Sequence, residues 1–247
     1  MGALTANTPK PLLALRGRPI IEHILCGFRS AGVDEVVIVV GYRGEQIETA
    51  LGDGTRLGLR LHYRRQHTAE GTAPALLLAR DVLDGDPFLL SWGDVVIDFA
   101  EYAALARERA AHPCDLLLSL NRVDDPWRGA AVYVDDSGRV TRVIEKPARG
   151  TSTTTWNNAG VFIPTPRIFE YAERLQASPR GEYELPQAIA AMIEAGCLVR
   201  AYALHGFWSD LGTPEDLAHA ETVFGPHPEP EEARERKPEG RPSESGH

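Results

Sequence analysis

The sequence predicts an α/β fold, in which a mixed, mostly parallel sheet is covered by helices on both faces. Strand and helix signals alternate through the first half of the chain. Residues 35–42 (EVVIVVGY) form a run rich in β-branched residues, which is typical of a strand buried on both faces. Residues 130–147 read as two alternating strands around the turn 135–138 (DDSG), which predicts a β-hairpin.

The elements of the first half are bounded by clear start and stop signals. Residues 19–32 have helical apolar spacing, begin with Pro19 and end on Gly32. The elements expected next, apart from the strand at 35–42, are a helix at 45–54, a strand at 59–66, a helix at 71–83, a strand at 87–94, a helix at 99–112 and a strand at 114–123. Because helices connect the strands, we expect mostly parallel pairing.

The second half continues after the hairpin and then changes composition. Its expected elements are a strand at 157–163, helices at 166–175 and 185–196, strands at 198–204 and 206–210, and a last helix at 214–224. From Gly225 onward the chain is rich in proline, glutamate, arginine and glycine and lacks large apolar residues. Such a segment cannot offset its ordering entropy by burial. We therefore expect one domain at 1–224 and a disordered tail at 225–247.

The composition limits the classes of partner. The chain has 247 residues and a formal charge of −9, which argues against general affinity for nucleic acid or anionic membranes but leaves a local phosphate site open. Cys26, Cys114 and Cys197 show no C-x-x-C spacing, and we expect reduced thiols. No signal peptide or apolar run of membrane length is seen, so we expect a cytoplasmic protein.

Several polar residues follow apolar strands, where ligands of open α/β sheets gather. They are Asp94, the pair Glu145 and Lys146, the pair Asn157 and Asn158, and Asp210. Each also has a structural interpretation, as a cap or as a solvated pair, and Thr213 is better placed than Asp210 to cap the last helix. Together they suit a site that binds a metal ion and phosphates, because two aspartates can hold Mg²⁺ and a lysine can neutralise a phosphate.

The order of the motifs identifies a family resemblance. They are PKPLL at 9–13, YRRQ at 63–66 with GTA at 71–73, GD at 93–94, EKP at 145–147, NNAG at 157–160 and GFWSDLGTPEDL at 206–217. In this order the sequence resembles the sugar-1-phosphate nucleotidylyltransferases, which make nucleotide sugars from a nucleoside triphosphate and a sugar 1-phosphate. The resemblance covers residues 1 to about 224 and implies a Rossmann-like fold with a sugar-binding hairpin part.

The resemblance implies a role for each matching position on the nucleotide side. Lys10 would contact the triphosphate near its α-phosphate. Gln66 and Gly71 would read the nucleobase, and Thr72 and Gly93 would also bind substrate. Asp94 and Asp210 would hold Mg²⁺, the expected cofactor, between the two phosphates.

The resemblance likewise implies the sugar-side residues. Glu145 would accept hydrogen bonds from sugar hydroxyls, Lys146 would neutralise the sugar phosphate, and Asn158 and Gly160 would line the sugar pocket. Lys10, Asp94, Lys146 and Asp210 form the implied catalytic set. The sugar phosphate oxygen would attack the α-phosphorus while pyrophosphate leaves, which demands neutralisation and in-line positioning more than covalent catalysis.

Three features depart from the family pattern. Trp92 stands where the family usually has a small or amide residue, so it either reshapes the pocket or packs. Pro74 follows GTA, where its ring suits the first turn of a helix. Family members also begin with an apolar strand and a GGxGTR loop that cradles the triphosphate, and Met1 stands just after the position of that arginine.

The start of the sequence therefore leads to expectations about stability and activity. Without a central strand we expect marginal stability and a slot in the sheet, because ladder hydrogen bonds are lost on two sides. Our first explanation is an incomplete start, such as a gene model that begins at an internal Met, in which case activity depends on upstream residues. Our second explanation is that the chain is a degenerate paralogue.

Two other classes of protein are alternatives to an active nucleotidylyltransferase. One is a non-catalytic nucleotide-sugar-binding or regulatory paralogue, and another, weaker, is a metal-dependent glycosyltransferase, which usually carries Asp-x-Asp. The sequence fixes neither the nucleobase, the sugar nor the oligomeric state, and a homo-oligomer is compatible with it.

Overall fold

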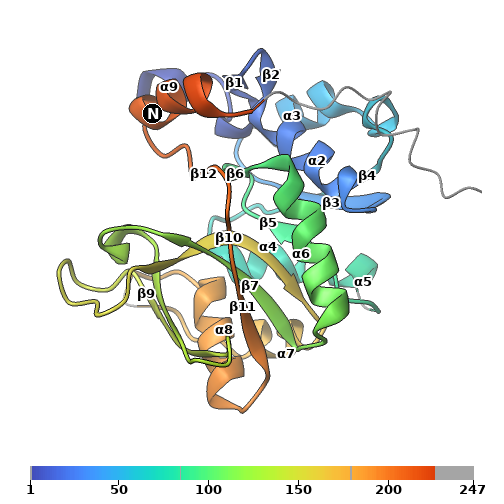
Figure 1. The fold of residues 1–247 in the computed structure, drawn as a ribbon. Helices are drawn as coiled ribbons and strands as arrows, with labels where there is room; N and C mark the ends of the chain where they lie inside the picture. The colour runs from blue at the N-terminus through green and yellow to red at the C-terminus, as the bar shows by residue number, and fades with distance from the viewer. Residues whose placement is uncertain (1, 84, 179, 226–247) are drawn as a thin grey trace, which may run out of the picture.

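The computed structural model describes residues 2–83, 85–178 and 180–225 (Figure 1). Its helices are, in chain order, α1 Gly2–Thr5, η1 Lys10–Leu12, α2 Ile20–Ser30, α3 Gly44–Leu51, η2 Thr55–Leu57, α4 Thr72–Leu77, α5 Arg80–Leu83, α6 Phe99–Ala111, η3 Pro126–Arg128, α7 Ile168–Glu173, α8 Leu185–Glu194 and α9 Pro214–Val223, where η marks a 3₁₀ helix. The predicted disordered tail lies outside the described residues, apart from Gly225.

The strands follow the predicted order closely. They are β1 Ala14–Leu15, β2 Arg18–Pro19, β3 Glu35–Val40, β4 Arg60–Arg65, β5 Leu90–Ser91, β6 Val96–Ile97, β7 Leu116–Arg122, β8 Ala130–Val134, β9 Val140–Glu145, β10 Trp156–Pro164, β11 Val199–Ala203 and β12 Trp208–Ser209. The helix expected at 71–83 is split into α4 and α5, because Ala79 N donates to Leu76 O in a tighter turn between them. Pro74 sits in the first turn of α4, as predicted.

The main sheet is mixed and is built around β10. Its strands run in the order β11-β7-β10-β8-β9, and β5 also pairs with β10. β3 with β4 and β7 with β11 are parallel, whereas β10 is antiparallel to β5, β7 and β8. The mixed sheet is confirmed, but fewer pairs are parallel than the alternation of strands and helices predicts. The cause is that β10 returns after the hairpin β8–β9 and inserts between β5 and β7.

Two hydrophobic clusters form the core. One joins α2, β3, β4 and α6, and the other joins the main sheet to α4, α7 and α8. In Figure 1 the first region occupies the upper part of the molecule, with α9 at its top, and α7 and α8 lie below the main sheet. Trp92, directly after β5, packs against both clusters and so links them.

A cavity separates β3 from β5. β3 pairs only with β4, and β5 only with β10, in the part of the chain that the structure describes. Between them lies a cavity of about 440 Å³, walled by both strands and by residues of α2, α4 and α5. β5 therefore has a strand partner on one edge only in the described chain.

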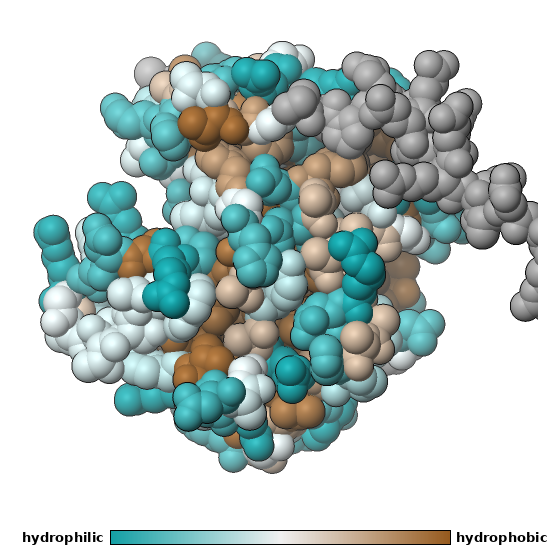
Figure 2. All heavy atoms as spheres, in the orientation of Figure 1, coloured by the Kyte–Doolittle hydropathy of each residue, from teal (hydrophilic) through white to brown (hydrophobic). Residues whose placement is uncertain are grey.

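No helix within the described ranges is long and apolar enough to cross a membrane. On the face shown in Figure 2, hydrophobic residues are scattered between polar ones. The exposed large hydrophobic residues, which include Leu4, Tyr42 and Leu198, come from separate elements. Among the residues coloured in that view, this face offers no broad apolar patch.

Candidate active site

The lysine near the start of the chain brings two distant aspartates together. Lys10 is the first residue of η1, and the next turn is anchored by Leu12 and Leu13, which pack against the core. Its ammonium Nζ lies 2.8 Å from Asp94 Oδ2 and 2.9 Å from the main-chain oxygen of Asp210. Asp94 and Asp210 lie 84 and 200 positions after Lys10 in the sequence, so three distant segments meet at this ammonium group.

The two aspartates do not cap helices. Asp98, not Asp94, precedes α6, and Thr213 caps α9, its hydroxyl accepting from Asp216 N at 3.1 Å. The side chain of Asp210 accepts only a local hydrogen bond, from Gly212 N at 3.2 Å. The interpretation of Asp210 as the cap of α9 is therefore wrong, and its carboxylate is available for another task.

The backbone beside Asp210 is held in an uncommon conformation. Leu211 has φ 44, and its side chain is fully buried. Lys146, at the end of β9, has φ 43. A left-handed conformation at a branched or long side chain costs free energy and tends to persist where function fixes the backbone. Two of the predicted site segments carry this feature.

The donor set at Asp94 and Asp210 fits a magnesium ion. Carboxylate oxygens are hard ligands, and Mg²⁺ is usually bound through one or two carboxylates together with phosphate and water. Within the described residues, no group of three or more His, Cys, Asp or Glu side chains could enclose a metal by itself. An ion here would thus take its remaining ligands from substrate and water, beside the ammonium of Lys10, which pairs with the Asp94 carboxylate.

A second charged cluster lies at the end of β9. Lys146 Nζ is 3.9 Å from Glu145 Oε1 and 3.6 Å from Glu184 Oε1, and Arg180 pairs with the other oxygen of Glu184. The side chains of Glu145 and Glu184 are only 16% and 7% exposed. Lys146 N also donates to Gly129 O at 2.7 Å, which fixes the turn after the strand. The interpretation of Glu145 and Lys146 as a solvated pair is therefore wrong for Glu145.

The two carboxylates of this cluster differ in their proton affinity. Burial, and then the charge of Glu184, raise the pKa of Glu145 to about 7, although Lys146 and Arg180 oppose the shift. Burial also acts to raise the pKa of Glu184, but the hydrogen bond and the charge of Arg180 outweigh it and lower that pKa. Near neutral pH, Glu184 is ionised while Glu145 is partly protonated, so Glu145 can both donate and accept hydrogen bonds.

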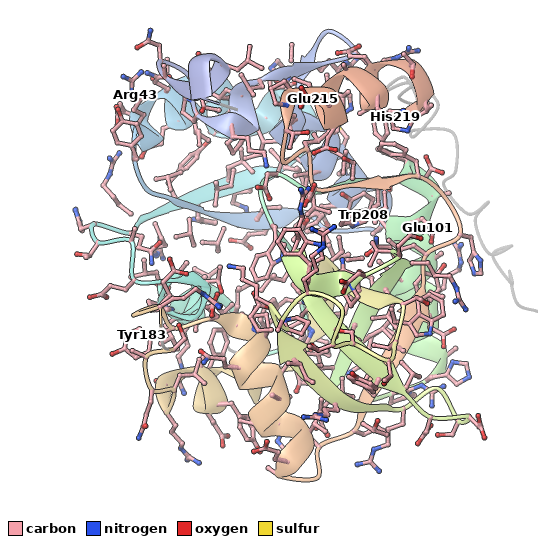
Figure 3. The ribbon with its side chains drawn as sticks, turned by 90° about the vertical axis from the view of Figure 1, so that its left-hand side faces the viewer. Arg43, Glu101, Tyr183, Trp208, Glu215 and His219 are labelled. Atoms are coloured by element: carbon pink, nitrogen blue, oxygen red, sulfur yellow. The ribbon has the colours of Figure 1, made fainter. Side chains whose placement is uncertain are left out.

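The segment expected to read the nucleobase is tied to this cluster. Gln66 Nε2 donates to Gly71 O at 3.0 Å. Gly71 has φ 118, and a Cβ there would lie 2.4 Å from the main-chain oxygen of Tyr183, so only glycine fits without movement. Thr72 Oγ1 accepts from Leu185 N at 2.8 Å. Tyr183 and Leu185, on either side of Glu184, therefore hold the loop from Gln66 to Thr72 in place. Tyr183 is labelled in Figure 3.

The NNAG segment forms a bulge in β10. The register with β7 shifts between Asn158 and Phe162, and Asn158 Oδ1 accepts from Gly160 N at 2.9 Å. Gly160 has φ 81, and an added Cβ would lie 2.4 Å from Trp92 Cδ1. Trp208 Nε1 donates to Ala159 O at 2.8 Å, and Figure 3 places Trp208 between the upper and lower parts of the molecule.

The remaining predicted residues are placed by packing. Trp92 stacks edge-on against Phe162, with ring centroids 5.2 Å apart, which supports its packing role. Gly93 is exposed, and a Cβ there would meet Pro11 at 3.6 Å. Gly93 thus lies beside η1 and next to Asp94, at the border of the cavity between β3 and β5.

Part of the charged cluster at the end of β9 was not predicted from the sequence. Glu184 and Arg180 were not predicted, although the segment 180–184 (RGEYE) concentrates charges just before an apolar helix. Asn157 donates to Asn121 Oδ1 at 2.9 Å and, through Oδ1, accepts from Ala130 N at 3.2 Å. These buried amides connect β7, β8 and β10 and position the bulge.

A family model described as nucleotidyl transferase matches residues 2–224. The chain belongs to the nucleotidyl transferase family. The matched range includes Lys10, Asp94, the cluster at Lys146 and Asp210.

Curated nucleotidyl transferases share about a third of their residues with this chain. A glucose-1-phosphate thymidylyltransferase of Streptomyces griseus is 34% identical over 214 residues, which are 87% of this chain and 59% of the relative. The low-salt glycan biosynthesis nucleotidyltransferase Agl11 of Haloferax volcanii is 30% identical over 218 residues, 88% of this chain and 60% of the relative. A UTP–glucose-1-phosphate uridylyltransferase, AglF, of the same organism is 33% identical, with 88% of each chain covered. The chain thus spans about 60% of the length of the first two.

The fold is also found among solved structures. One described as a putative glucose-1-phosphate thymidylyltransferase from Bacillus anthracis superposes with a TM-score of 0.81 at 24% identity, covering 90% of this chain and 89% of the other. A UDP-glucose pyrophosphorylase complexed with UDP-glucose gives a TM-score of 0.78 at 18% identity, covering 87% and 89%. At these identities the likeness concerns the fold, and it confirms the Rossmann-like α/β prediction.

Proposed function

We propose that this nucleotidyl transferase moves a nucleotidyl group from a nucleoside triphosphate to a sugar 1-phosphate, releasing pyrophosphate. The observation that carries the proposal is the meeting of Lys10, Asp94 and Asp210 at one ammonium group. A reaction between two phosphates needs a positive charge and a cation site at the point where they approach. The names of the curated relatives support this reaction class.

The residues at the first cluster bind and orient the phosphates. Lys10 neutralises the triphosphate near its α-phosphorus, and Asp94 and Asp210 hold Mg²⁺. When bound, Mg²⁺ supplies charge neutralisation and alignment for both phosphates. Gly93, which has no side chain beside Asp94, leaves room for close approach of substrate.

The residues at the second cluster bind the acceptor. Lys146 neutralises the sugar phosphate, and Glu145, which exchanges a proton near neutral pH, hydrogen-bonds sugar hydroxyls. Asn158 and Gly160 line the sugar pocket at the bulge of β10. Gln66, with the Gly71–Thr72 turn, borders the nucleobase.

The identity of the base and of the sugar is tested with a substrate panel. The full chain is incubated with UTP, dTTP, GTP or CTP and with several sugar 1-phosphates, and pyrophosphate release is measured with and without Mg²⁺. We expect Mg²⁺-dependent release that requires both substrates. The reverse reaction, which forms triphosphate from nucleotide sugar and pyrophosphate, serves as a second readout.

The aspartates are tested with matched variants. Asp94→Asn and Asp210→Asn should lower turnover at least about a hundredfold, because each removes a charge at the reacting phosphates. Asp136→Asn, on the exposed hairpin turn, is the control and should keep full activity. Nucleotide-sugar binding without release or consumption of pyrophosphate in any combination would favour a non-catalytic binding protein, which the relatives' names do not support.

The proposal also covers the cellular location of the protein and its oligomeric state. The three cysteines are free, which suits the reducing cytoplasm, and fractionation of the native host would test this location. The prediction that a strand and a glycine-rich loop precede Met1 stays a prediction, and so does a homo-oligomer.

A further inference from the structure

Two carboxylates at the start of α6 bind a turn that leads to Asp210. Asp98 directly precedes α6, and Glu101 lies in its first turn. The spacing Asp-x-x-Glu resembles a capping box, but the side chain of Asp98 makes no capping hydrogen bond to α6. Asp98 N, which a capping box would pair with Glu101, donates instead to Phe207 O at 3.0 Å. Both side chains are therefore free to serve another segment.

The partners of these carboxylates are three consecutive main-chain N–H groups, those of residues 205–207. Glu101 Oε1 accepts from His205 N at 2.8 Å and from Gly206 N at 2.9 Å. Asp98 Oδ2 accepts from Phe207 N at 2.8 Å. Glu101 is buried although it is acidic, with 6% of the residue exposed. Because hydrogen bonds to an ionised carboxylate are stronger than neutral ones, they hold this turn firmly.

The turn at 205–207 fixes how β12 pairs with β6. The two strands are antiparallel and share only two residue pairs, Trp208 with Ile97 and Ser209 with Val96. So short a ladder is marginal by itself, and its register needs support from outside. A slip of one residue would displace β12 by about 3.4 Å and turn its side chains to the opposite face. The two carboxylates bind the turn directly before β12 and so prevent such a slip.

The other end of the same ladder carries the two aspartates of the candidate metal site. Val95 separates Asp94 from β6, and Asp210 directly follows β12. In an antiparallel pair the start of one strand lies beside the end of the other, which explains why Asp94 and Asp210 both reach Lys10. Their separation depends on the register of β12. Figure 3 labels Glu101 and Trp208, which lie at the same level of the molecule.

We propose that Asp98 and Glu101 are positioning residues, which hold Asp94 and Asp210 at the separation that a divalent cation requires. The proposal rests on the proposed function, because it concerns the place where Mg²⁺ would be held. Mg²⁺ demands near-ideal octahedral geometry with ligand distances of about 2.0–2.1 Å, so a displacement of about 3.4 Å removes a protein ligand. Both residues act through the turn at 205–207.

Direct binding of Mn²⁺ tests the proposal without requiring catalysis. Carboxylates and water suit Mn²⁺ as they suit Mg²⁺, and EPR of the free ion gives the Kd when the full chain is titrated with Mn²⁺ alone. Asp210→Asn should abolish this binding, which identifies the site. Glu101→Ala and Asp98→Ala should each raise the Kd at least about tenfold. Glu101→Gln, whose amide oxygen still accepts from both N–H groups, should stay within about threefold.

A stability control separates positioning from a general loosening of α6. Leu105→Ala removes a fully buried side chain of the same helix and should lower the melting temperature, but it should keep the Kd for Mn²⁺ within about twofold. Hydrogen exchange is the second readout, because the amides of residues 205–207 should exchange at least about tenfold faster in Glu101→Ala. If Glu101→Ala fails to fold, Asp98→Ala is compared with Asp98→Asn, which keeps an acceptor oxygen.

The outcomes distinguish this proposal from the proposed function. Mn²⁺ binding that requires Asp210 but is unchanged in Glu101→Ala and Asp98→Ala would overturn the positioning role and leave the metal site intact. An equal loss of affinity in Leu105→Ala would also overturn the positioning role. If the unchanged protein binds no Mn²⁺, or if Asp210→Asn binds it equally well, the metal site of the proposed function is wrong and the positioning role falls with it.

Discussion

The buried carboxyl of Glu145 makes a prediction that depends on pH. The folded protein holds the proton of Glu145 up to about pH 7, whereas an unfolded glutamate releases it near 4.5. Between these values the folded state binds more protons, so the contribution of Glu145 to stability falls as pH rises. Above pH 7 the full penalty remains, and the difference between the two pKa values corresponds to up to about 3 kcal/mol.

Glu145→Gln removes this penalty without changing the shape of the side chain. Glutamine resembles the protonated glutamate, so the variant and the unchanged protein should differ in stability by no more than about 1 kcal/mol at pH 5 and converge below about pH 4.5. At pH 8 the variant should be more stable by up to about 3 kcal/mol, because burial no longer opposes ionisation and the repulsion from Glu184 is gone.

Urea denaturation at pH 5, 6, 7 and 8 measures the difference in the free energy of unfolding. Glu182→Gln, at an exposed position of the same region, is the control and should change stability by less than about 0.5 kcal/mol at every pH. A difference between Glu145→Gln and the unchanged protein that stays constant from pH 5 to pH 8 would refute the assignment of a raised pKa to Glu145.

The other predictions concern backbone fit, capping and charge. Gly160→Ala should lower the free energy of unfolding by more than about 2 kcal/mol in thermal unfolding, because its Cβ would meet Trp92 and its φ is 81. The control Gly150→Ala, with φ 74 and open space around the new Cβ, should cost only about 1 kcal/mol. Equal losses in the two variants would contradict the contact with Trp92. Thr213→Ala should cost about 1 kcal/mol of stability through the lost cap of α9 and leave the Kd for substrate unchanged, and a large loss of binding would show a role beyond capping. Lys10→Met should change stability by less than about 1 kcal/mol, because its ion pair is partly exposed, but should weaken nucleoside triphosphate binding at least tenfold by titration calorimetry.

The order of the elements could be predicted from the sequence because it depends on local signals. Proline at the start of α2, the β-branched run of β3 and the turn between β8 and β9 each fix conformation over a few residues. Thr213 was likewise recognisable as a cap, since its side chain reaches only the next turn. The pairing of β10 was not predictable, because a strand's own residues do not specify which of several edges it will join.

The residues of the candidate site could likewise be predicted only in part from the sequence. Asp94 and Asp210 could be singled out because they follow apolar strands, whereas the role of Lys10 was implied by the family resemblance alone. Their meeting, and the addition of Arg180 and Glu184 to the cluster at Lys146, required the fold.

By itself, the sequence determined the helices, the strands, the charged residues and the resemblance, all of which are written in short-range patterns. Only the tertiary structure decided that Glu145 is buried and changes its proton affinity, that one lysine joins both aspartates, and that β3 and β5 face an apolar cavity. The physical reason is that burial, charge proximity and edge pairing arise between segments far apart in the chain, where their strength depends on distance and surroundings that no local pattern encodes.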